Sequence, residues 1–113
     1  MTKDPLDRLR HILESIEKIN SYVAEYASAE SLAGDDRSLD AVVRRLEIIG
    51  EAVKALPDDL KSPDFAQWKE IAGMRDVLIH KYFGVNHRIL WDTVQQDLPR
   101  LKAAIERSLK PGG

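Results

Sequence analysis

The sequence predicts an all-α protein built as an up-and-down bundle of four main helices. Apolar residues recur at three- and four-residue spacing through most of the chain, and loop-type residues separate these periodic stretches. No stretch shows the strict alternation of apolar and polar residues that a half-buried strand requires. Because 113 residues fit one hydrophobic core, we expect a single domain over residues 1–113, with a frayed tail at 108–113.

The composition is that of a globular protein. Hydrophobic residues make up 43% of the chain and charged residues 32%, which excludes the disordered class. The absence of cysteine excludes disulfides and thiolate metal sites. No secretory signal or membrane span is recognisable, so a cytoplasmic location is expected. The net charge of −2 argues against a broad basic face, so any contact with RNA must be local.

The first helix is predicted over residues 5–27 from its start signal and its apolar stripe. Asp4 is an N-cap residue, and Pro5 follows it in the first helical turn, where its missing N–H costs nothing. The next stretch, residues 28–37, has the composition of a loop.

Ser38 is expected to cap a second helix, which runs to about Leu56. Gly50 lies beside the apolar stripe of this helix. A glycine there costs roughly 1 kcal/mol of helix stability relative to alanine, so we expect another helix to approach closely at that point.

The remaining chain predicts two further helical segments. A third segment begins after Ser62 or Asp64, bends near Gly73 and continues into the motif described next. The last helix begins with Asn86 as its N-cap. Pro99 removes one helical hydrogen bond, so a kink or a short break is expected just before it.

One short stretch of the third segment carries the candidate chemistry. Asp76 and His80 would be i,i+4 neighbours in a helix, where the carboxylate could accept the imidazole N–H and fix one tautomer. Arg75 shares a face with Tyr82 but differs by about 140° from His80 around a straight helix. Arg75 and His80 converge only if the segment bends near Gly73, or if two copies face each other across a two-fold axis.

This constellation suits RNA cleavage without a metal or any other cofactor. A ribose 2′-hydroxyl needs a general base, the leaving 5′-oxygen needs a proton, and His80 exchanges protons near neutral pH. Arg75 can contact two phosphate oxygens at once. Weaker contacts with RNA are expected from three further basic residues: Lys81, Arg44 and Arg45.

Plainer interpretations are open for each of these residues. An arginine and a histidine at this spacing also occur in buried or interface networks, and His11 and His87 are expected to be surface or capping residues. Glu47 and Glu51 are i,i+4 on the second helix and could serve an active site, although ion pairs with nearby bases are favoured. Those bases are Arg44, Arg45 and Lys54.

Several runs of sequence carry a resemblance to a known family. They are RLEIIGEA at 45–52, WKEIAGMRD at 68–76, HKYFGV at 80–85, WDTV at 91–94 and DLP at 97–99. Together these runs resemble the HepT family of HEPN-domain proteins over about residues 40–105. The first helix matches only in general character.

The resemblance implies an all-α HEPN-like bundle that forms a homodimer, in which both subunits contribute an Arg-x4-His-x-Tyr motif to a shared cleft. Here that motif is Arg75, His80 and Tyr82. The family implies a ribonuclease toxin of a HepT/MntA-type toxin–antitoxin module, whose antitoxin is a minimal nucleotidyltransferase. Transfer of AMP to Tyr82 by this partner would add negative charge at the cleft and repel RNA.

Asp76 departs from the family pattern, which commonly has asparagine after the motif arginine. A carboxylate at this position favours the protonated form of His80 but lies close to an anionic substrate, so reduced activity is expected. Two other functions stay open at this stage. One is a non-catalytic helical partner or nucleotide-binding module of a minimal nucleotidyltransferase, and the other is an inert dimerisation bundle.

Overall fold

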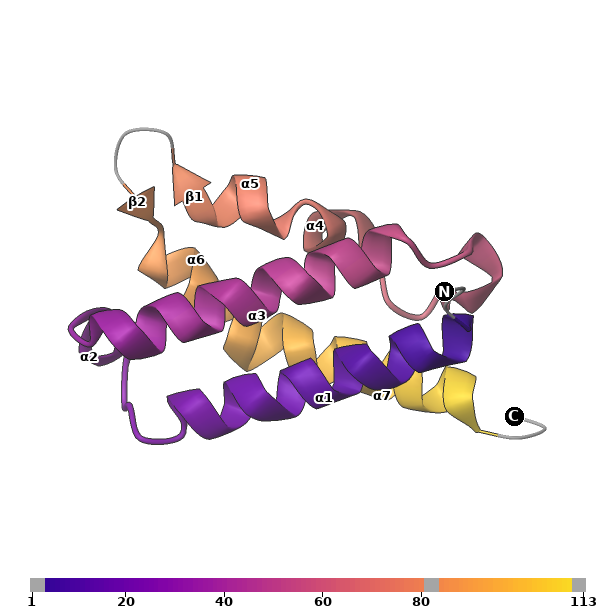
Figure 1. Cartoon of the computed structure of the whole chain (residues 1–113), viewed down its shortest axis with the longest axis horizontal. Coiled ribbons are helices and arrows are strands. Elements are labelled where there is room, and N and C mark those ends of the chain that lie inside the picture. The colour runs from indigo at the N-terminus through magenta and orange to yellow at the C-terminus, as the bar shows by residue number, and fades with distance from the viewer. Residues whose placement is uncertain (1–3, 81–83, 111–113) are drawn as a thin grey trace.

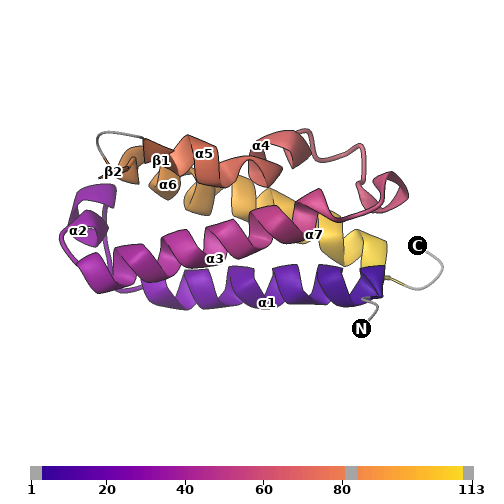
Figure 2. The ribbon, with the colours of Figure 1, turned by 45° about the horizontal axis from the view of Figure 1, so that its top comes forward.

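The protein is described by a computed structural model that covers residues 4–80 and 84–110. Its two longest helices, α1 (Pro5–Val23) and α3 (Asp36–Lys54), lie side by side in both ribbon views, and the later segments pack on them (Figures 1 and 2). The predicted all-α class is therefore confirmed. None of the helices in the described part of the chain has the length and apolar character needed to cross a membrane.

The start of α1 follows the sequence prediction. The Asp4 side chain accepts a hydrogen bond from the Leu6 N–H at 2.9 Å, and Pro5 occupies the first turn. The helix ends at Val23, four residues before the predicted end.

A short helix, α2 (Ala29–Ala33), occupies the stretch that was predicted to be a loop, so this prediction is wrong. Ser28 caps it by accepting a hydrogen bond from the Ser31 N–H at 3.1 Å. Leu32 is fully buried in the core. A helix this short is stabilised by such packing rather than by its intrinsic propensity.

The N-cap of α3 is Asp35, and the prediction of Ser38 is wrong. The Asp35 carboxylate accepts a hydrogen bond from the Ser38 N–H at 3.3 Å. The Tyr26 hydroxyl also donates to Asp35 and lies 2.8 Å from the Ser38 hydroxyl. The hydrogen bond from Tyr26 holds the pKa of Asp35 below its ordinary value, which keeps the cap ionised.

After a 3-10 turn (η1, Asp58–Leu60), α4 spans Trp68–Ala72 and thus starts later than predicted. Neither Ser62 nor Asp64 caps it. Ser62 instead accepts a hydrogen bond from the Trp68 indole through its backbone carbonyl, at 2.8 Å. This contact and the edge-on packing of Phe65 on Trp68 order the preceding loop, which delays the helix start.

Gly73 ends α4 and separates it from α5 (Met74–Leu78), which confirms the predicted bend. The chain then leaves the helix for a two-stranded antiparallel ladder, β1 (Ile79–His80) with β2 (Gly84–Val85). The prediction that the third helical segment continues through the motif is therefore wrong. The helix cannot continue past Leu78, because the chain pairs back on itself as antiparallel β1 and β2.

The last helix is interrupted, as Pro99 predicts. Asn86 caps α6 (His87–Asp92) by accepting a hydrogen bond from the Ile89 N–H at 3.1 Å. A π-helical turn (η2, Thr93–Asp97) then leads into α7 (Leu98–Leu109). The proline therefore sits in the first turn of a new helix, where its missing N–H is tolerated. Helix α7 extends two residues into the predicted tail.

The core lies where α1, α3 and α7 meet, and α4 and α5 cover another side of α3 (Figures 1 and 2). Each long helix contributes a stripe of fully buried aliphatic side chains, as amphipathic periodicity predicts. The largest of these are Leu9, Ile12, Ile16, Ile19, Leu46, Ile49, Leu98 and Leu101.

Gly50 is the point of closest approach between α3 and α4. A Cβ atom built on it would lie 2.9 Å from the Ile71 carbonyl oxygen and 3.4 Å from that of Ala72. Both are backbone atoms, so no side chain can rotate out of the way. The close approach expected from the sequence is confirmed.

We predict that Gly50→Ala lowers the free energy of unfolding by about 1–3 kcal/mol, because overpacking against backbone outweighs the gain in helix propensity. Urea denaturation of the two proteins measures this difference. Gly34→Ala is the matched control, since its Cβ would lie 3.5 Å or more from any atom. Equal stability of Gly50→Ala and the wild type would contradict this account of α3–α4 packing.

Candidate functional site

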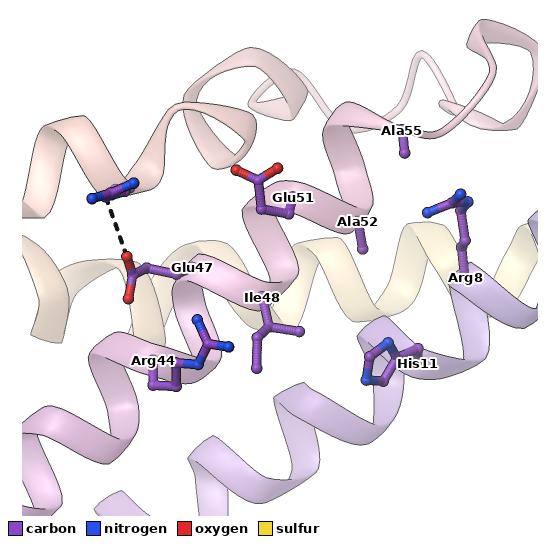
Figure 3. A pocket seen from close by; sticks show the side chains of 9 residues that line it. Arg8, His11, Arg44, Glu47, Ile48, Glu51, Ala52 and Ala55 are labelled. Atoms are coloured by element: carbon purple, nitrogen blue, oxygen red, sulfur yellow. Dashed lines mark ion pairs between the residues drawn. The ribbon is translucent and has the colours of Figure 1, made fainter.

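Arg75 is the motif residue that the structure places most clearly. It is the second residue of α5, and its side chain is 72% exposed. Its Nε atom lies 3.4 Å from a carboxylate oxygen of Glu47, whose side chain is only 22% exposed (Figure 3, dashed line). A half-buried carboxylate on a rigid helix thus holds an otherwise exposed guanidinium in place.

The Glu47–Arg75 ion pair follows from the way α3 meets α4 and α5. Glu47 lies about one helical turn before Gly50, where the backbones touch, and Arg75 lies one turn beyond the contacted Ala72. The favoured account, in which Glu47 pairs with a base on its own helix, is therefore wrong. For Glu51 that account is confirmed, because it lies 3.7 Å from Lys54.

A groove of about 500 Å³ opens beside this ion pair (Figure 3). We call it the α1–α3 groove, because most of its lining residues belong to these two helices. The exceptions are Ala55, which directly follows α3, and Arg75 of α5. It is lined by Arg8, His11, Arg44, Glu47, Ile48, Glu51, Ala52, Ala55 and Arg75. The ion pair thus forms part of the wall of an open, strongly charged depression.

The other predicted site residues are distributed as follows. Arg44 lines the α1–α3 groove, whereas Arg45 does not. Asp76 is exposed on α5. The backbone of His80 lies in β1, paired with Gly84. The predictions for Lys81 and Tyr82 fall outside the described residues.

The structure contradicts the expected helical contact between Asp76 and His80. Helix α5 ends at Leu78, so the two residues do not occupy one helical face. A role of Asp76 in orienting the imidazole stays a prediction. It would have to rely on the turn from α5 into β1 rather than on i,i+4 geometry.

Arg8 and His11 also line the groove, although neither was among the predicted site residues. They are separated by three positions and therefore share a face of α1. Their spacing can be read from the sequence, but only the packing of α1 beside α3 shows that this face lines the same groove as Arg44 and Arg75. Among the side chains that the structure describes, which do not include that of His80, no group of three or more His, Asp or Glu is arranged to hold a metal ion.

Comparison with known proteins decides the family. The family model described as ribonuclease HepT-like matches residues 12–108. The chain belongs to the HepT-like ribonuclease family. No solved structure is significantly similar to it.

Three relatives illustrate the range of HepT-like proteins. A Thermococcus cleftensis protein, provisionally named ribonuclease HepT, is 45% identical over 97% of this chain and all of its own length. A Caldanaerobacter subterraneus protein, provisionally named an RNase, is 45% identical over 96% of each chain. A Methanocaldococcus jannaschii protein, whose name joins gamma-glutamylcyclotransferase to a provisional RNase, is 45% identical over 93% of this chain. The HepT-like chain matches only 47% of that longer protein.

Proposed function

We propose that this HepT-like chain is a metal-independent endoribonuclease that acts in the cytoplasm as the toxin of a HepT/MntA-type toxin–antitoxin module. The observation that carries the proposal is the exposed Arg75 guanidinium, held by Glu47 at the edge of a charged groove. In a member of a ribonuclease family, such a group is suited to contact a scissile phosphate, because guanidinium donors match phosphate oxygens geometrically.

The proposed reaction is an attack by the ribose 2′-hydroxyl on the adjacent phosphorus. The His80 imidazole of one subunit takes the 2′-hydroxyl proton as the 2′-oxygen bonds to phosphorus. The bond from phosphorus to the 5′-oxygen breaks, and the partner subunit's His80 gives a proton to that leaving oxygen. Arg75 stabilises the charge that gathers on the phosphate oxygens. The products are a 2′,3′-cyclic phosphate and a 5′-hydroxyl.

A homodimer with a composite cleft supplies two such imidazoles. The exposure of Arg75 on α5 supports this arrangement, because its guanidinium is open to a second copy of the chain. Val77 is also exposed on this short helix, on another side of it.

The proposed antitoxin is a minimal nucleotidyltransferase that transfers AMP to Tyr82. Tyr82 follows His80 by two residues in the sequence, so an AMP group on its hydroxyl would add a bulky anion close to the imidazole. That anion would repel the RNA backbone and compete for the Arg75 guanidinium. The proposed modification therefore acts on the same charges that would bind the substrate.

Cleavage of a labelled RNA in the presence of EDTA tests the central residues. Arg75→Ala and His80→Ala are each expected to lower kcat by about 10²–10⁴-fold, the usual cost of losing a general acid, general base or oxyanion donor. Arg107→Ala and His87→Ala are matched controls that should keep full activity, because both residues pair with acids elsewhere in the fold.

Cleavage that survives His80→Ala would rule out the proposed chemistry. A wild-type protein that binds the nucleotidyltransferase but cuts no RNA and is harmless on expression would favour the non-catalytic partner instead.

Glu47 should act as a positioning residue through Arg75. Glu47→Gln is expected to lower kcat roughly tenfold, because a small displacement of the guanidinium weakens its contact with the phosphate. Stability should change by less than about 1 kcal/mol, since Arg75 is mostly exposed. Glu14→Gln, which loses an exposed i,i+4 pair with Lys18, is the matched control.

A double variant separates positioning from a merely structural role. Glu47→Gln should cost nothing further in a protein that already carries Arg75→Ala. An equal loss of kcat in the presence and absence of the Arg75 side chain would show that Glu47 does not act through it.

Mass spectrometry of the chain co-expressed with a nucleotidyltransferase encoded beside it tests the modification. The wild type should gain the mass of one or more AMP units, while Tyr82→Phe should gain none and stay toxic. Tyr22→Phe, which removes a half-buried hydroxyl in α1, should be modified normally. AMP addition to Tyr82→Phe would show that another residue is the acceptor.

A further inference from the structure

The α1–α3 groove extends well beyond Arg75. Its residues on the α3 side run from Arg44 to Ala55, which corresponds to about 16 Å at the helical rise of 1.5 Å per residue. A smaller hollow of about 320 Å³, lined by Asp7, Arg8, His11 and Ala52, overlaps it on the α1 side. In a duplex, each strand advances roughly 3.4 Å per phosphate along the helix axis, and an extended single strand advances farther per phosphate. The depression is therefore long enough for only a few phosphates of an extended strand.

The acids of the groove are already engaged, whereas two of its arginines are not. Glu47 pairs with Arg75 and Glu51 with Lys54. Among the residues that the structure describes, Arg8 and Arg44 have no acid within ion-pair distance. Their charges are thus available to an anion that enters the groove.

The shape of the groove also favours a strand rather than a small compact ligand. Ala52 and Ala55 present only a methyl group where α3 passes the start of α1, which leaves space between the two helices (Figure 3). Arg8 and His11 reach toward that space from α1, while Arg44 lies at the other end of the groove. Arg8 and Arg44 therefore place positive charge at the two ends of the α1–α3 groove.

We propose that the α1–α3 groove binds the phosphodiester backbone of single-stranded RNA next to the scissile linkage at Arg75. Arg8 and Arg44 contact separate phosphates, and His11 adds a hydrogen-bonding ring beside Arg8. This site rests on the proposed ribonuclease function and extends it from one phosphate to a stretch of the substrate. Among the described residues that line the groove there is no Phe, Tyr or Trp on which bases could stack, so these residues hold the strand through its phosphates rather than by reading its sequence.

Salt-dependent binding tests this site. The probe is a fluorescently labelled oligonucleotide made entirely of 2′-O-methyl RNA, which lacks the attacking hydroxyl and cannot be cut. Each phosphate contact on a single strand contributes about 0.7 to the slope of log K against log salt. The Arg8→Ala/Arg44→Ala variant should therefore lose about 1.4 from this slope and bind roughly ten- to thirty-fold more weakly at 0.1 M salt. Arg100→Ala/Arg107→Ala removes the same charge from exposed positions on α7 and should bind like the wild type.

Steady-state kinetics on two substrates show whether the two arginines act in substrate binding or in the chemical step. With a long RNA, the Arg8→Ala/Arg44→Ala variant should show a raised KM and an almost unchanged kcat. With a dinucleotide, whose single phosphate lies at Arg75, both constants of Arg8→Ala should match those of the wild type, because Arg8 lines the part of the groove near Ala52. A loss of kcat on the dinucleotide in Arg8→Ala would overturn the assignment, because that arginine would then act at the reaction centre.

These measurements distinguish a wrong assignment of the RNA-binding groove from a wrong assignment of the ribonuclease function. If the wild type cuts RNA but the double variant keeps its salt slope and affinity, the groove does not bind RNA. If the double variant instead changes the oligomeric state, measured by light scattering, while RNA affinity is unchanged, the groove is a protein interface and the proposal is wrong. A wild type that neither binds nor cuts RNA overturns the function and the groove together.

Discussion

The contact between the α3 backbone at Gly50 and the end of α4 is the constraint on which the candidate site depends. Only a residue without a side chain permits an approach at which a Cβ would lie 2.9 Å from the Ile71 carbonyl oxygen. This contact fixes α4 on α3, and the bend at Gly73 then directs α5 so that Arg75 meets Glu47. Without this contact, Arg75 would not be placed beside Glu47, and the ion pair between them could not form.

The ion pairs on α3 explain how a protein with a net negative charge could bind the anionic RNA backbone. A chain with a net charge of −2 has no general attraction for RNA. Along the α1–α3 groove, however, the two glutamates are paired with Arg75 and Lys54, and the remaining arginines face open space. Local pairing of the acids therefore leaves unpaired positive charge along the groove of an acidic protein, which is the arrangement that a local contact with the RNA backbone would need.

Local signals in the sequence predicted local structure well. Asp4 and Asn86 cap the helices that they were expected to cap, and Pro99 marks the interruption of the last helix, because capping and proline chemistry act within one turn. Other local signals failed, because Asp35 rather than Ser38 caps α3, and neither Ser62 nor Asp64 caps α4. The remaining errors involve contacts between distant segments. Helix α2 depends on packing and on the pair between Glu30 and Arg88 of α6. The pairing of Glu47 with Arg75 depends on how α3 meets α5, which neither segment encodes alone.

In the proposed reaction, the 2′-hydroxyl of the RNA attacks the phosphate held by Arg75. The most direct test is an analysis of the ends of RNA cut by the wild-type chain. We expect a 2′,3′-cyclic phosphate on one fragment and a 5′-hydroxyl on the other, because the attacking oxygen belongs to the substrate. Fragments that carry a 3′-hydroxyl and a 5′-phosphate would show that water attacks instead, and would contradict the account.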